Sequence, residues 1–231
     1  MANHPIALIV GANRGIGLGV VTEFLARGWD IVATARRPAE AHALASLAQT
    51  HPGRVEVKLL DMNEPAQVDG FAGGLGPRLL DVALVNAGVA GPEHRSASQA
   101  TAQEIGALMV TNAIAPIRLA RHLVARIRPG TGVLAFTSSV MGSVALNAGG
   151  HELYRASKAA LNSLSRGLYG ELGGQLTLLT LHPGWVRTDM GGSGAAVSVA
   201  DSARGMVDVI LREQGRHHHV FLDYTGKEIA W

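Results

Sequence analysis

The sequence contains no cysteine and no long apolar run, and each absence excludes a kind of protein. Without cysteine the chain forms no disulfide, offers no thiolate nucleophile and binds no metal through sulfur, which fits a cytoplasmic protein. No apolar run reaches the roughly 18 residues that a membrane span needs, so we expect no membrane contact. An apolar segment follows Met1 within five residues, and we therefore expect no signal peptide.

Charge is also scarce, because charged residues make up 16% of the chain and apolar residues 47%. This balance suits a sheet covered on both faces and excludes intrinsic disorder. The net charge is +2, and the arginines that dominate the basic residues are scattered along the chain. We expect no nucleic acid partner, since that would require a dense basic stripe.

Seven short apolar runs alternate with segments of helical periodicity, the pattern of parallel strands joined by crossover helices. The sequence predicts an α/β single-domain Rossmann fold, with a doubly wound, seven-stranded parallel sheet and helices on both faces. One domain over residues 1–231 is expected, because no linker or repeat interrupts the pattern. Ligands of such folds bind at the carboxyl ends of the strands. The expected strands are residues 6–10, 31–35, 55–59, 82–85, 133–136, 176–181 and 220–222.

A glycine-rich turn follows the first expected strand and leads into a helix expected to start near Gly15. Gly11, Gly15 and Gly17 would let backbone N–H groups and the helix N-terminus approach a pyrophosphate, which side chains there would block. With 29 glycines in 231 residues this spacing is expected about 0.5 times by chance, so the preceding strand is what selects these three. A second match, at residues 70–76, lacks such a strand and is interpreted as a loop.

The end of the second strand indicates which dinucleotide binds. About 20 residues beyond the glycine turn, this position faces the adenosine ribose, where an acidic residue would bind a free 2′-hydroxyl. Here it holds Arg36, which we expect to pair with a 2′-phosphate, helped by Arg14. NADP(H) is therefore the expected cofactor. Arg37 is interpreted as a solvated charge, and the same reading is the alternative for Arg36.

Tyr154 and Lys158 stand four residues apart in a segment of helical pattern, which places them on one face. Three tyrosines and three lysines would give this spacing about 0.04 times by chance. A nearby ammonium lowers the pKa of a phenol from its usual value of about 10 and makes it an acid or base near neutrality. The alternative is a surface tyrosine that packs along a lysine stem.

A serine after a strand and a run of three histidines are two further features of the sequence. Ser139 follows the fifth expected strand, where a hydroxyl can hold a carbonyl oxygen as charge develops on it, although serines there often only cap turns. The histidines at 217–219 do not predict a metal site, because neighbours in a strand point to opposite faces and no acidic residues cluster beside them. They are interpreted as a solvated run.

The order of these motifs, together with Asn86-Ala-Gly88, Asn112 and residues 182–188, resembles the short-chain dehydrogenase/reductase family over the whole chain. Within that family, residues 154–162, 182–192 and 221–226 are most similar to the C-factor and sniffer-type carbonyl reductases. The resemblance implies an NADPH-dependent oxidoreductase (EC 1.1.1.-) that reduces an aldehyde, ketone or quinone to an alcohol. It also implies a small-molecule substrate and a homodimer or homotetramer. The short, glycine-rich segment of residues 189–194 predicts a mobile lid around residues 189–200 that orders when cofactor or substrate binds.

The resemblance also assigns catalytic roles. Tyr154 protonates the substrate oxygen while a hydride passes from the nicotinamide to the carbonyl carbon, and Lys158 holds the nicotinamide ribose and tunes Tyr154. Asn112, expected in the middle of a helix, supports a water relay to Lys158. Ser139 orients the carbonyl, since it begins the family's Ser-x-x-Gly pattern. Its spacing from Tyr154 is slightly long for the family, which leaves Ser138 and Ser143 as rivals.

The implied cofactor contacts extend along the whole chain. Residues 61 and 62 would flank the adenine, residues 86–88 would line the cofactor floor, and residues 183–188 would grip the nicotinamide side. The family often has an asparagine where Val85 stands, a departure that backbone contacts should tolerate. The implied cofactor-binding residues are Gly11, Asn13, Arg14, Gly15, Ile16, Gly17, Arg36, Asp61, Met62, Asn86, Ala87, Gly88, Tyr154, Lys158, Pro183, Gly184, Val186 and Thr188.

Two other functions compete with the reductase. A nucleotide-binding signalling or sensor protein of this fold needs the glycine turn but not a tuned acid, so Tyr154 and Lys158 argue against it. A sugar-nucleotide epimerase or dehydratase would need additional C-terminal sequence to build its second pocket.

Overall fold

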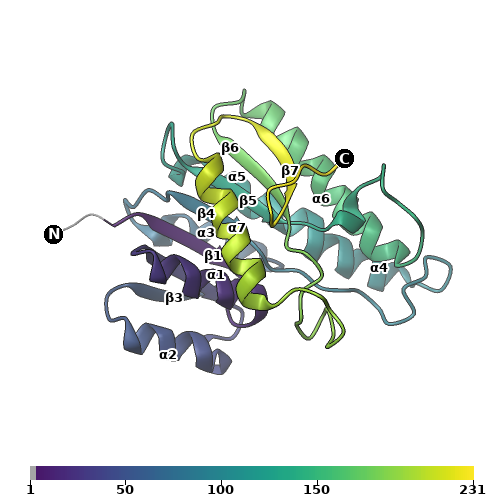
Figure 1. Cartoon of the computed structure of the whole chain (residues 1–231), viewed down its shortest axis with the longest axis horizontal. Helices are drawn as coiled ribbons and strands as arrows, with labels where there is room; N and C mark the ends of the chain where they lie inside the picture. The colour runs from purple at the N-terminus through teal and green to yellow at the C-terminus, as the bar shows by residue number, and fades with distance from the viewer. Residues whose placement is uncertain (1–3) are drawn as a thin grey trace.

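The computed structural model describes residues 4–231, which form a three-layer α/β sandwich (Figure 1). Seven strands make one parallel sheet in the order β3-β2-β1-β4-β5-β6-β7, so the expected doubly wound fold is confirmed. Every expected strand is present, with its ends shifted by no more than one residue. The strands are β1 (Ile6–Val10), β2 (Asp30–Ala35), β3 (Val55–Leu59), β4 (Val82–Val85), β5 (Val133–Thr137), β6 (Thr177–His182) and β7 (His219–Asp223).

Alternate residues of each strand point into two separate apolar cores. Ile9 and Leu84 contact the helices on one face, whereas Leu8 and Ala83 contact those on the other. Both faces are covered, which explains why the central strands β1, β4 and β5 read as nearly continuous apolar runs. One layer contains α1 (Gly15–Ala26), α2 (His42–Thr50) and α7 (Val199–Glu213); the other contains α3 (Pro65–Phe71), α5 (Ala115–Leu123) and α6 (Glu152–Glu171).

The strand order reverses between β1 and β4, because the chain builds outward from β1 to β3 before β4 pairs with the other side of β1. The connections after these two strands leave in opposite directions and open a crevice at their carboxyl ends. Residues that follow β1, β4, β5 and β6 therefore meet along one edge of the sheet.

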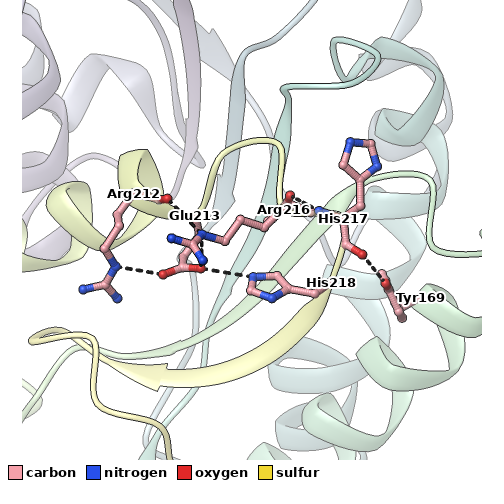
Figure 2. Close-up of polar contacts among 7 residues, drawn as sticks. Tyr169, Arg212, Glu213, Arg216, His217 and His218 are labelled. Atoms are coloured by element: carbon pink, nitrogen blue, oxygen red, sulfur yellow. Dashed lines mark hydrogen bonds and ion pairs between the residues drawn. The ribbon is translucent and has the colours of Figure 1, made fainter.

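Two local expectations were wrong. Gly70 lies inside α3 and not in a loop, because Val68 and Phe71 of that helix are buried against the sheet. The histidine run is not simply solvated: His218 Nε2 lies 3.2 Å from the carboxylate of Glu213, buried at the end of α7, which two arginines also contact (Figure 2). Among the described residues no group of three or more His, Cys, Asp or Glu side chains could hold a metal ion.

The two edges of the sheet differ. β3 carries the paired charges Glu56 and Lys58. Beside β7 the chain folds back, so that Asp223 N–H donates to the Lys227 carbonyl (2.9 Å) and Ile229 N–H to the Phe221 carbonyl (2.8 Å). This return segment, residues 227–231, crosses toward the loop after β5 (Figure 1).

No helix within residues 4–231 is long and apolar enough to cross a bilayer. Residues 1–3, on which the expectation about a signal peptide partly rests, lie outside the described part of the chain.

Candidate active site

The glycine turn is packed so closely that a side chain at Gly11 or Gly17 would clash. Gly11 has a φ of +79°, and a Cβ there would lie 2.8 Å from the Cβ of Ala87. A Cβ at Gly17 would lie 2.1 Å from the carbonyl oxygen of Gly11. Asn86 Nδ2 donates to that same carbonyl (3.3 Å), so the turn and the start of the cofactor floor are held together. Asn13 lies on the exposed side of the turn, and Ile16 lies in the first turn of α1, packed against the core.

The helix that follows leaves its first N–H groups available. The N-cap of α1 is Arg14, an extended residue whose side chain makes no hydrogen bond to the helix, and the first turn contains no acidic residue. Uncapped N–H groups and the positive end of the helix dipole form a binding surface for an anion. This surface lies where a pyrophosphate was expected.

Three arginines near the turn have different partners. Arg14 pairs with Asp189, in the segment after β6, and both side chains are exposed. Arg37 lies 3.2 Å from Glu40. Arg36, directly after β2, makes no ion pair within residues 4–231. The two neighbouring arginines thus differ in their surroundings, and a phosphate role for Arg36 stays a prediction.

Residues 61 and 62 follow β3 at the same edge. Asp61 Oδ1 accepts a hydrogen bond from Asn63 N–H (2.9 Å), and its own N–H donates to Gln67 (2.8 Å). Met62 is buried in the core on the α5 side. The loop is therefore ordered by its own contacts.

Tyr154 and Lys158 lie on one face of α6, which begins after His151, a residue in the left-handed region (φ +51°). The Lys158 Nζ is 5.9 Å from the centre of the Tyr154 ring. Lys158 is buried, and its Nζ donates to the carbonyl of Thr137 (2.9 Å), the last residue of β5. The helix is held in place by its apolar residues Leu161 and Leu168, which are buried in the core.

Burial dominates the ionisation of this pair. It raises the pKa of Tyr154 to about 12, against which a hydrogen bond with Ser139 acts. It also lowers the pKa of Lys158 to about 8. The phenol pKa is thus raised by the protein and not lowered by the ammonium, because desolvation outweighs an attraction over this distance. Tyr154 stays protonated at neutral pH, as a proton donor must.

The structure separates the three candidate serines. Ser139 caps the 3-10 turn Val140–Gly142, with its Oγ accepting from Met141 N–H (3.1 Å), and it is the serine that meets Tyr154. Ser138 Oγ donates to Asn162 (2.6 Å), and Ser143 Oγ accepts from Leu146 N–H (3.1 Å). These two hydroxyls hold the loop together, which leaves Ser139 as the candidate for a substrate oxygen.

Asn112 is fully buried in a π-helical turn, Val110–Ile114, between α4 (Ala102–Met109) and α5. Its amide accepts from Val89 N–H and donates to the Val89 carbonyl (both 2.8 Å), and it donates to Ser157 Oγ (3.0 Å). It therefore ties the loop after β4 to α6. A Cβ on Gly88 would lie 3.2 Å from Asn112 Oδ1 and 3.4 Å from Lys158 Nζ, so glycine keeps open the space beside the lysine.

The segment after β6 closes one side of the site. Pro183 accepts a hydrogen bond from Ser202 (2.6 Å), and Gly184 has a φ of +86°. Val186 is buried and bridges to Val197, and Thr188 Oγ1 accepts from Gly191 N–H (3.1 Å). The expected lid is thus a hydrogen-bonded loop, and α7 begins inside its range.

Sequence reasoning missed three polar residues that hold the site together. Thr137 accepts from Lys158 and donates from its Oγ1 to Asn86 Oδ1 (2.9 Å). Ser157 Oγ accepts a hydrogen bond from the Asn112 amide, and Asn162 Oδ1 accepts one from the Ser138 hydroxyl. The signal was present, since each is a polar residue at an apolar strand end or on the buried face of a helix.

A parallel sheet with a glycine turn at its switch point, and a Tyr–Ser–Lys group at the neighbouring strand ends, defines a dinucleotide-binding oxidoreductase fold. Comparison with known proteins gives the family. Residues 5–197 match the family described as short chain dehydrogenase, and the chain therefore belongs to that family.

Individual similar proteins support this family assignment. The C-signal protein of Myxococcus xanthus is 39% identical over 156 residues, which cover 66% of this chain and 93% of that protein. A carbonyl reductase from Pseudomonas aeruginosa PAO1, solved in complex with NADP, is 43% identical with a TM-score of 0.93, covering 99% of this chain and 100% of that one. Carbonyl reductase Sniffer of D. melanogaster is 30% identical with a TM-score of 0.89, covering 99% and 100%. The resemblance to the C-factor and sniffer-type members is confirmed.

Proposed function

We propose that this protein is an NADP(H)-dependent carbonyl reductase, which reduces an aldehyde, ketone or quinone to an alcohol. The observation that carries the proposal is the arrangement around Tyr154. Its hydroxyl contacts Ser139, and the Nζ of buried Lys158 lies over its ring. The similar carbonyl reductase from P. aeruginosa, solved with NADP, supports both the activity and the cofactor.

The chain's own residues fit the cofactor. The uncapped start of α1 suits the pyrophosphate, and unpaired Arg36 suits a 2′-phosphate. Gly88 leaves space beside Lys158, where a ribose would be held. When bound, NADPH supplies the hydride for the carbonyl carbon.

The proton comes from Tyr154. The proton of its phenol O–H passes to the carbonyl oxygen as the carbon accepts the hydride. Hydride and proton together convert the carbonyl to the alcohol and leave Tyr154 as the phenolate. Ser139 holds the same oxygen by hydrogen bonding as charge develops there. Lys158 stabilises the phenolate that Tyr154 leaves behind, and proton return runs through Lys158 toward Asn112 by way of water. Asn112 positions that route from its place between the loop after β4 and α6.

We place the protein in the cytoplasm, as a homodimer or homotetramer acting on a small molecule. Light scattering on a sizing column tests the assembly, and a purely monomeric species would contradict it.

A nucleotide-binding sensor of the same fold is the second candidate, because the C-signal protein is similar to this chain.

The deciding experiment follows NADPH absorbance with a panel of aldehydes, ketones and quinones, in parallel with NADH. We expect turnover with NADPH that Tyr154→Phe abolishes while NADPH binding persists. Tyr169→Phe is a matched control, because that hydroxyl bonds the His217 carbonyl (2.8 Å), away from the site. Tight NADPH binding by the wild type without turnover of any compound would favour the sensor.

A further inference from the structure

The loop of residues 144–148, which follows the turn that carries Ser139, makes few contacts outside itself. Val144 and Leu146 are 72% and 53% exposed, and the loop's bonds at Ser143 and Asn147 are local. A groove of about 420 Å³ lies behind it, lined by Gly142, Val144, Ala159, Asn162, Ser163, Arg166 and Trp231. This loop is thus backed by open space, whereas the turn before it packs on α6, where a Cβ at Gly142 would lie 2.9 Å from the Cβ of Lys158.

Two polar contacts link the turn and the loop after it to α6 and to the return segment of residues 227–231. Asn162 Nδ2 donates to the carbonyl of Gly142 (3.1 Å), at the end of the turn. Ala145 N–H donates to the main-chain oxygen of Trp231, the last residue of the sequence (3.0 Å). Within the described chain, this second bond is the one hydrogen bond that joins residues 144–148 to a distant part of the sequence.

The Trp231 ring is itself fixed from two elements. It lies 4.7 Å from the His219 ring and 5.4 Å from the Phe221 ring, both on β7. The guanidinium of Arg166, on α6, lies 5.8 Å from the ring centre, within cation–π range. Because the ring is held by these contacts, the main-chain oxygen of Trp231 is also held in place. The loop of residues 144–148 is anchored in turn, since Ala145 donates its hydrogen bond to that oxygen.

We propose that Trp231 is a positioning residue for Ser139: it anchors the loop after β5 and so sets where the substrate oxygen is held. This rests on the proposed reductase function. The ring contacts and the hydrogen bond of Trp231 do not involve Tyr154 or Lys158, so its loss should weaken substrate binding without weakening cofactor binding.

The test compares Trp231→Ala, Trp231→Phe and a control on the same segment, Glu228→Gln, whose side chain is exposed. For Trp231→Ala we expect KM for the carbonyl to rise about tenfold, equivalent to about 1.4 kcal/mol, with kcat and the NADPH Kd changed less than about threefold. Phenylalanine should restore most of the KM, and Glu228→Gln should leave it unchanged. Unchanged KM in folded Trp231→Ala, or an equal loss of NADPH affinity, would overturn the proposal.

Hydrogen exchange at the Ala145 amide gives a readout independent of turnover. The amide should be protected in the wild type and exchange faster in Trp231→Ala; equal rates would overturn the anchor. If the wild type reduces no carbonyl, the proposed function fails while this measurement still decides whether the anchor exists. If Trp231→Ala does not fold, Arg166→Met, which removes an exposed cation from the ring, should raise both the exchange rate and KM by a smaller factor.

Discussion

Lys158 donates the hydrogen bond from its ammonium to the backbone carbonyl of Thr137 and not to a carboxylate. The bond runs from α6 to the last residue of β5, two residues before Ser139. One contact therefore sets the distance between the helix that carries Tyr154 and the turn that carries the serine. It also leaves a buried cation without a counter-charge, and that has a measurable cost.

The free energy of unfolding should rise as pH rises from about 8 toward 10. Burial lowers the pKa of Lys158 to about 8, whereas the unfolded lysine keeps a value near 10.5, so in this window the unfolded chain binds more protons. Between pH 7.5 and 9.5 the gain from this group is about 2 kcal/mol. Above pH 10 the raised pKa of Tyr154 acts in the opposite direction.

Urea unfolding of the wild type and of Lys158→Met over this range measures the effect. The slope should vanish in Lys158→Met and persist in Lys227→Met, which alters an exposed lysine. A slope that survives in Lys158→Met would show that another group titrates.

Arg36→Ala should weaken NADPH binding and leave NADH binding unchanged. Loss of a charged hydrogen bond to the 2′-phosphate costs about 1.5 to 3 kcal/mol, or roughly tenfold to a hundredfold in Kd. Arg37→Ala is the matched control, because Arg37 pairs with Glu40. Fluorescence titration with both cofactors decides it. Equal losses in the two variants would mean that general positive charge, and not Arg36 itself, attracts the cofactor.

Gly17→Ala should abolish tight cofactor binding, because its Cβ would lie 2.1 Å from the Gly11 carbonyl oxygen. Forcing that oxygen aside should destabilise the fold by about 1 to 3 kcal/mol. In contrast, a Cβ at Gly70 in α3 meets nothing within 4 Å, and Gly70→Ala should stabilise by about 0.5 to 1 kcal/mol. Thermal unfolding with and without NADPH separates the two. NADPH protection that persists in Gly17→Ala would contradict this account of the turn.

The loop of residues 189–198 should become more protected from hydrogen exchange when NADPH binds. It contacts the glycine turn through the exposed Arg14–Asp189 pair, and exposed pairs contribute only about 0 to 1 kcal/mol, so this contact alone should not hold the loop closed. Exchange without cofactor as slow as in β5, and unchanged by NADPH, would show a rigid loop. Asp189→Asn should speed exchange in the free protein.

The sheet could be predicted from the sequence because both of its faces are buried, so that its central strands consist mostly of apolar residues, whereas the edge strand β3 alternates apolar and charged ones. That Tyr154 and Lys158 share one helix face could be predicted as well, since four residues make about one helical turn. Other features of the site could not be predicted, because they depend on contacts between residues far apart in the sequence. The wide turn at Asn112 depends on Val89 and Ser157, and the raised pKa of Tyr154 depends on burial that no local pattern records. Likewise, the partner of Ala145 lies 86 residues further along the chain.

The two edges of the sheet limit how copies of this protein can join. The carboxyl half of β7 already pairs with its own return segment, and β3 presents the charges of Glu56 and Lys58. Covered or charged edges oppose the addition of a foreign strand. Association must therefore use helix or loop surfaces, and concentrated solutions should resist growth of a continuous sheet from one molecule to the next.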